Sequence, residues 1–129
     1  MAENFNIEII SPEFKLLAEK VNSVTIPGYE GDMTILKDHI PVITFLRPGI
    51  IEVSADKERK YFVEEGTVEF FENNLSILSS TISELSKLTK EHVSKMIDQC
   101  KDQLNKENLD DKKRYLVSHK LDCLTRISL

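Results

Sequence analysis

Residues 26–51 read IPGYEGDMTILKDHIPVITFLRPGII and hold three of the chain's four prolines and three of its four glycines. These residues interrupt short runs of β-branched and other apolar side chains. Proline gives no hydrogen bond to a strand ladder, and glycine accepts backbone conformations that other residues avoid. The stretch therefore predicts tightly turned β structure, with a loop tip at Tyr29–Asp32.

Similar short β-rich runs continue on both sides of this stretch, as far as about Ser80. Many of them start about 8 to 10 residues apart, and each is bounded by Pro, Gly, Asn, Asp or charged residues. This spacing is typical of an all-β sandwich or barrel, and not of alternating strands and helices. We predict strands at Ile7–Ile10, Phe14–Leu17, Val21–Ile26, Met33–Leu36, Val42–Leu46, Ile50–Val53, Tyr61–Val63, Val68–Phe71 and Leu75–Leu78.

Turns between these strands are predicted from their residue types. Gly28 and Gly31 allow the backbone to reverse where a side chain would clash. Arg47-Pro48-Gly49 suits a type II turn, because proline presets φ and glycine accepts a positive φ. Asn73-Asn74 suits a two-residue hairpin turn, because asparagine tolerates the left-handed region.

Helical periodicity replaces this pattern from Thr89 onward, where glycine and proline are absent. Thr89 is the predicted N-cap of a first helix and Asn108 that of a second, with a short turn at Asn105–Asn108. Two amphipathic helices with so short a link predict an antiparallel hairpin. Apolar stripes are formed by Val93, Met96, Ile97, Cys100 and Leu104 in the first helix and by Leu116, Val117, Leu121, Leu124 and Ile127 in the second.

The predicted fold class is therefore α+β by content: an N-terminal antiparallel β-sandwich at residues 1–83 and a C-terminal antiparallel two-helix hairpin at residues 84–129. Charge changes near the same place. Residues 1–80 carry 7 basic and 14 acidic side chains, a net −7, whereas residues 81–129 carry 10 and 8, a net +2. An acidic first part argues against nucleic acid as a partner, because phosphate binding needs clustered Lys and Arg.

Few side chains are arranged for chemistry. The three histidines, His39, His92 and His119, fall in different predicted elements, and no metalloprotease, nucleophile-elbow, P-loop or dinucleotide motif occurs. Cys100 and Cys123 lack metal-ligand spacing, and their expected axial offset of roughly 12 Å along the hairpin excludes a disulfide. The residues predict a non-enzymatic binding or assembly module without catalytic residue, cofactor or metal.

The order of residues within 26–51 resembles the N-terminal domain of the ATP synthase epsilon chain. The shared pattern is Pro-Gly-x-Glu-Gly-[Asp/Glu], then Ile-Leu, a His-x-Pro step and Pro-Gly-Ile-Ile, with further matches at residues 9–13, 62–66 and 74–78. It is carried by Pro27, Gly28, Glu30, Gly31, Asp32, Leu36, His39, Pro41, Pro48 and Gly49. The resemblance reaches to about residue 80.

The resemblance implies a non-catalytic rotor subunit in the central stalk of a proton-translocating F-type ATP synthase. The sandwich would contact the gamma chain through Asp38, His39, Ile40 and Pro41, and the c-ring through Tyr29, Glu30, Gly31 and Asp32. The hairpin would fold against the sandwich or extend along gamma toward the alpha and beta subunits, where it restrains ATP hydrolysis. Contacts with the beta subunit in the extended state are expected from Lys112, Lys113, Arg114, Lys120 and Arg126.

One departure from the family concerns ATP. Some epsilon chains bind ATP between the helices through an Ile/Leu-Asp-x-x-Arg-Ala pattern, and the corresponding stretch here is Glu84–Thr89. Ser86 stands in place of the aspartate and Thr89 in place of the arginine. No ATP site of that kind is expected.

The start of the sequence has neither a secretory signal nor an Arg-rich transit segment, and no apolar run reaches the length of a membrane span. A peripheral protein at the cytoplasmic face of the bacterial inner membrane is therefore expected, associated with the membrane only through the complex. The alternative is a stand-alone β-sandwich ligand-binding or adaptor module, dimerised by its helical hairpin. A rotor subunit would expose apolar side chains on one sandwich face, whereas the alternative would expose them on the hairpin.

Overall fold

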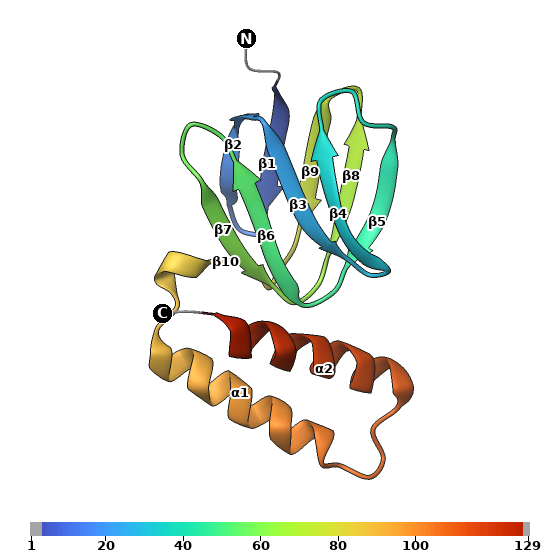
Figure 1. The fold of residues 1–129 in the computed structure, drawn as a ribbon, viewed down its shortest axis with the longest axis vertical. Coiled ribbons are helices and arrows are strands. Elements are labelled where there is room, and N and C mark those ends of the chain that lie inside the picture. The colour runs from blue at the N-terminus through green and yellow to red at the C-terminus, as the bar shows by residue number, and fades with distance from the viewer. Residues whose placement is uncertain (1–3, 128–129) are drawn as a thin grey trace.

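The computed structural model describes residues 4–127, in which a β-sandwich stands on a pair of helices (Figure 1). The strands are β1 Phe5–Ile10, β2 Lys15–Val21, β3 Ser23–Gly28, β4 Gly31–Leu36, β5 Val42–Leu46, β6 Gly49–Ser54, β7 Arg59–Val63, β8 Gly66–Phe71, β9 Asn74–Leu78 and β10 Ser83–Glu84. A 3-10 helix at Leu85–Lys87 leads into helices α1 Lys90–Leu104 and α2 Asp111–Arg126. Residues 1–3 and 128–129, the outer ends of the two predicted units, lie outside the described residues.

The strands form two layers. One layer has the order β2-β1-β9-β8-β5, and the other has β4-β3-β6-β7-β10. The layers are joined where Gly28 of β3 pairs with Leu46 of β5. Neighbouring strands of the described chain run antiparallel except for β1 and β9, which are parallel. The predicted β-sandwich is confirmed, and the parallel pair is a feature that the sequence pattern did not indicate.

Alternating side chains fill the space between the layers. In β1, Phe5, Ile7 and Ile9 are buried while the intervening side chains face outward. The rings of Phe5 and Phe70 meet edge to face with centroids 5.5 Å apart. Each fully buried side chain of this size contributes roughly 1.5–3 kcal/mol. This sandwich core contains no residue from α1 or α2.

The predicted run Val21–Ile26 is wrong as one strand, because the chain breaks at Asn22 between β2 and β3. Val21 and Val24 are both buried, although residues three apart point to opposite faces of a regular strand. An irregularity between them is therefore needed. The Asn22 amide donates to the Ser54 carbonyl at 2.8 Å, which fixes the break against β6.

Two predicted turns are also corrected. Gly49 does not adopt a positive φ, so the predicted type II turn at 47–49 is wrong. A Cβ on Gly49 would lie 2.5 Å from the Cβ of Pro27, and this close approach explains why the residue is glycine. The β8–β9 turn lies one residue earlier than predicted. Glu72 and Asn73 have φ of 48° and 61°, and Phe71 pairs with Asn74. Two consecutive left-handed residues match the twist of a hairpin.

The helix boundaries follow capping chemistry. Thr89 caps α1 as predicted, and its side chain accepts from the His92 amide at 3.1 Å. The N-cap predicted at Asn108 is wrong, because Asp110 caps α2 and accepts from the Lys113 amide at 2.7 Å. The carboxylate offers the same hydrogen bond as asparagine and adds negative charge at the positive end of the helix dipole.

A second apolar core joins the two helices to the outer side of β7. Phe62 is buried there against the hairpin. Leu104 and Leu116 belong to the predicted stripes but lie outside this core, whereas the remaining stripe residues are in it. Cys100 and Cys123 are free thiols, as predicted. The stripe residues that are buried in this second core are Val93, Met96, Cys100 and Leu124, and those that are partly buried are Ile97, Val117, Leu121 and Ile127.

Strand β10 crosses the predicted boundary between residues 83 and 84. Its Ser83 and Glu84 pair with Phe62 and Tyr61 of β7, so the sandwich pairing continues for one residue beyond residue 83. The division into units 1–83 and 84–129 stays a prediction.

Candidate interaction surfaces

Helix α2 lies across the end of the sandwich that carries the β3–β4 turn (Figure 1). We call this turn, residues 29–32, the tip. Its backbone depends on glycine at both ends: a Cβ on Gly28 would lie 2.7 Å from the Gly31 carbonyl oxygen, and Gly31 has a φ of +146°. The predicted glycine turn is thus confirmed.

The tip residues differ in what they face. The Tyr29 ring lies 5.1 Å from that of Tyr115 on α2, and its side chain is half-buried. Glu30 is exposed, and Asp32 lies 3.7 Å from Arg47 with 72% of its side chain exposed. In this position of the hairpin, Glu30 and Asp32 are open to a partner, whereas Tyr29 is engaged by α2. Their contact with a c-ring stays a prediction.

Tyr115 is the centre of the polar contacts between α2 and the sandwich. Its hydroxyl donates to the backbone carbonyl of Tyr29 and accepts from Arg47 Nη1 at 3.3 Å. On its other side the ring meets His119 with centroids 4.5 Å apart. Burial, reinforced by the Arg47 charge, lowers the pKa of His119 below its ordinary value, although Asp122 and Asp32 act in the opposite direction.

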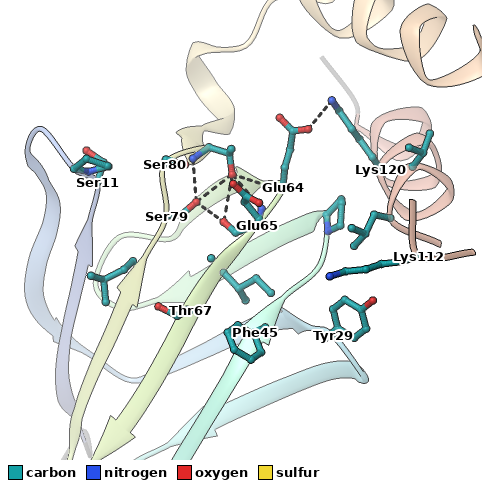
Figure 2. A pocket seen from close by; sticks show the side chains of 18 of the residues that line it. Ser11, Tyr29, Phe45, Glu64, Glu65, Thr67, Ser79, Ser80, Lys112 and Lys120 are labelled. Atoms are coloured by element: carbon teal, nitrogen blue, oxygen red, sulfur yellow. Dashed lines mark hydrogen bonds and ion pairs between the residues drawn. The ribbon is translucent and has the colours of Figure 1, made fainter. Parts of the chain in front are cut away.

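A charged contact lies farther along α2. Lys120 Nζ is 2.6 Å from Glu64 Oε1, and only 18% of the lysine side chain is exposed. Both residues of this pair line a groove of about 1170 Å³ between α2 and the sandwich. Lys112 extends from the helix into the groove on the side of Tyr29 and Phe45, whereas Lys120 extends toward Glu64 (Figure 2).

The basic residues predicted for the beta subunit do not share one face. Lys120 is held by Glu64, and Arg126 pairs with Asp122 one turn earlier at 3.2 Å. The other three, Lys112, Lys113 and Arg114, are exposed and form no ion pair within residues 4–127. Contacts of these residues with a beta subunit stay a prediction.

The four residues predicted to face gamma lie in the β4–β5 loop, at the opposite end of the sandwich. Asp38 has a φ of 65°, and its backbone amide donates to the Asn73 side chain at 2.7 Å. The His39 ring packs edge to face on Phe70 with centroids 6.0 Å apart, whereas Ile40 is 73% exposed and Pro41 is also exposed. The loop is therefore held on its inner side by Asn73 and Phe70, and it is apolar on its outer side.

Sequence reasoning missed four exposed apolar side chains on the outside of β5, β8 and β9, which extend from near this loop to the groove under α2. We call them the outer face: Ile43, Phe45, Phe71 and Leu78. Ile43 is 83% exposed and Phe45 is 63% exposed. Phe45 of β5 pairs with Thr67 of β8, which pairs with Leu78 of β9, so these three residues lie in one row across the strands. The signal was present in VITFL, residues 42–46, in which the outward residues Ile43 and Phe45 are apolar as well as the inward Val42 and Leu46.

Residues 4–127 hold no group of three His, Cys, Asp or Glu side chains placed to bind a metal ion. In the same part of the chain, no helix combines the length and the apolar character needed to cross a membrane.

Comparison with known proteins identifies the family of this chain. Residues 4–84 match a family model described as the β-sandwich domain of the ATP synthase delta/epsilon chain. The ATP synthase epsilon chain of Pelagibacter ubique (strain HTCC1062) is 42% identical over 130 residues, covering 99% of this chain and 100% of that one. That of Allorhizobium ampelinum is 34% identical, covering 95% and 88%. The chain belongs to the ATP synthase epsilon chain family.

Two solved structures share the fold. A chain from the cryo-EM structure of the Euglena gracilis mitochondrial ATP synthase, with OSCP, F1 and c-ring, has a TM-score of 0.75 at 21% identity and covers 97% of this chain and 79% of that one. A chain from the Tetrahymena thermophila mitochondrial ATP synthase central stalk and c-ring has a TM-score of 0.64 at 14% identity, covering 94% and 93%.

Proposed function

We propose that the chain is a non-catalytic subunit of the central stalk of a bacterial F-type ATP synthase, where it couples proton flow to ATP synthesis. The sandwich binds the gamma chain through the outer face and the adjoining loop 38–41. The tip rests on the c-ring, and the complex holds the chain at the cytoplasmic face of the inner membrane. The hairpin, when released, reaches the alpha and beta subunits and restrains ATP hydrolysis.

The observation that carries this proposal is the location of the large exposed apolar side chains. Phe14, Leu36, Ile40 and the four residues of the outer face all belong to the sandwich, and none of the described residues of α1 or α2 is among them. A patch of this kind on a sheet marks a protein interface. The alternative module, dimerised by its hairpin, requires such side chains on the helices.

The experiment is co-purification of gamma with a tagged full-length chain, followed by a binding titration of the variant Phe45→Glu. A carboxylate placed in the centre of an apolar interface leaves a charge without a partner. We expect gamma affinity to fall by about 30-fold or more, the loss typical of a central interface residue.

The control is Glu52→Lys, an exposed charge reversal on the other layer, where Glu52 lies 4.0 Å from Lys60. This variant should bind gamma like the original chain. Equal affinity of the Phe45→Glu variant would exclude the outer face as the gamma site.

A further inference from the structure

The tip and helix α2 share their polar contacts. The Tyr115 hydroxyl donates to the Tyr29 carbonyl, and the same hydroxyl accepts from Arg47 Nη1 at 3.3 Å. The other terminal nitrogen of Arg47 lies 3.7 Å from Asp32 Oδ1. One hydroxyl therefore joins the hairpin to the tip, and one guanidinium joins that hydroxyl to a tip carboxylate.

These groups differ in their access to a partner. The Arg47 side chain is 20% exposed, whereas that of Asp32 is 72% exposed. A basic group of a partner can reach Asp32 while Arg47 stays between the tip and the helix. Such a group draws the carboxylate away from Arg47, which then loses the anion that holds its guanidinium beside Tyr115. A hydrogen bond from a charged donor is stronger than a neutral one, so its loosening matters for docking.

We propose that the tip and α2 are thermodynamically linked through Arg47 and Tyr115, so that a partner with basic groups at Asp32 favours release of the hairpin. The partner half of this inference rests on the proposed contact between the tip and the c-ring. Linkage is reciprocal, and docking of the hairpin therefore weakens binding at the tip by the same factor. The tip contact and the position of the hairpin then affect each other through these two side chains.

The test begins with the isolated full-length chain and uses Cys100 as the reporter. Cys100 is fully buried in the core between the hairpin and β7, so a thiol reagent reaches it only when that core opens. Cys123 is replaced by alanine in every variant, which leaves one thiol. The rate of labelling then measures the fraction of open hairpin.

Three single variants define the expected effects. Tyr115→Phe keeps the ring and removes the shared hydroxyl, and it should accelerate labelling by about 5- to 30-fold. Asp32→Asn should accelerate it by about twofold to fivefold, because exposed ion pairs are weak. The matched control is Glu30→Gln, a neutralised carboxylate on the same tip, which should label at the original rate.

The decisive measurement is the double variant. If the link runs through Arg47 and Tyr115, Asp32→Asn should have less than about 1.5-fold effect once Tyr115 is phenylalanine. Equal effects of Asp32→Asn in both backgrounds overturn the inference. Urea unfolding of each variant shows whether the sandwich itself is unchanged, and Asp32→Glu, which keeps the charge, should restore slow labelling.

A second arm separates this inference from the proposed function. The double variant Glu30→Lys and Asp32→Lys should lower proton-driven ATP synthesis in membrane vesicles, while the reversals Asp56→Lys and Glu58→Lys, in the β6–β7 turn, should not. Unchanged synthesis overturns the ring contact and the partner half of the inference, even if the labelling cycle shows coupling. If ATP synthesis is lowered but the effects of Asp32→Asn and Tyr115→Phe on labelling are additive, the contact between the tip and the c-ring is supported and the link between the tip and α2 is overturned.

Discussion

His119 shows how one residue makes docking depend on pH. In the docked hairpin its pKa lies below the ordinary value of 6.5, mainly because it is partly buried and also because Arg47 is near. The neutral ring is therefore favoured in the docked state. The stabilisation of the docked hairpin by neutral His119 is fully present above about pH 6.5, the pKa of a free histidine, and is lost as the pH falls below this value.

We therefore expect the docked fraction to fall when the pH is lowered from about 7.5 to about 5.5, a range that spans the ordinary pKa of histidine. The methyl NMR signal of Met96, which is buried in the hairpin core, measures this fraction. His119→Gln should remove most of the pH dependence, and His92→Gln, on the exposed side of α1, should retain it. The same slope in the His119→Gln variant would assign the effect to another group.

At the scale of single residues, the sequence predicted the glycine turn and the helix cap better than the contacts between distant residues. The glycines of the tip and the Thr89 cap are set by local backbone conformation and hydrogen bonding, and a few neighbouring residues are enough to predict these. The errors at Gly49 and Asn108 arose where a distant atom or a competing neighbour decided: the ring of Pro27 in one case and the Asp110 carboxylate in the other. Tyr115 gave no signal, because its hydroxyl partner is 86 residues away.

Among the elements, helix α2 combines two roles on different sides. Lys120 lies toward the sandwich and pairs with Glu64, whereas Lys113 and Arg114 are exposed in the first turns. Release of the proposed kind would break the first contact, whereas Lys113 and Arg114 are already exposed in the docked hairpin. Docking and the proposed inhibition should therefore be separable by mutation.

The double variant Lys113→Glu and Arg114→Glu should leave the Met96 signal of the docked hairpin unchanged, because both side chains are exposed and form no ion pair within residues 4–127. ATP hydrolysis by the assembled complex should rise, since the helix then repels acidic surfaces of the beta subunit. The matched control is Lys95→Glu with Lys101→Glu, on the exposed face of α1. Hydrolysis at the original rate in the α2 variant would rule out these two residues as the beta contact.

Strands and helices were the most predictable level of the fold. Every predicted apolar run overlaps a strand, and the two stripes predicted the hairpin, because both patterns record which face is buried. Leu116 shows the limit of this reasoning. It has helical spacing with the core residues of α2, yet it lines the groove, since the stripe is wider than the contact with α1.

The whole molecule has two cores, and this division controls what can be removed. The sandwich core is complete without the helices, whereas the hairpin core needs Phe62 and Ile50 from the sandwich. Docking therefore adds stability to the hairpin more than to the sandwich. How the two parts meet was not predictable from sequence, because the residues that meet at the seam are far apart in the chain: Phe62 packs against residues of both helices, and the polar contacts of Tyr115 join it to residues 68 and 86 positions away.

A chain that ends after Leu88 should accordingly fold, because it keeps the pairing of β10 with β7 and loses no residue of the sandwich core. Phe62 would lose its cover, so the truncation is combined with Phe62→Thr, and the full-length Phe62→Thr chain is the control. We expect cooperative urea unfolding, retained gamma binding and ATP synthesis, and faster ATP hydrolysis by the complex, because the restraining hairpin is absent. Lost gamma binding in the folded truncation would place that interface on the helices, where the structure shows no large exposed apolar side chain among its described residues. Unchanged hydrolysis would mean that the hairpin restrains nothing in this enzyme, and that its docking on the sandwich serves stability alone.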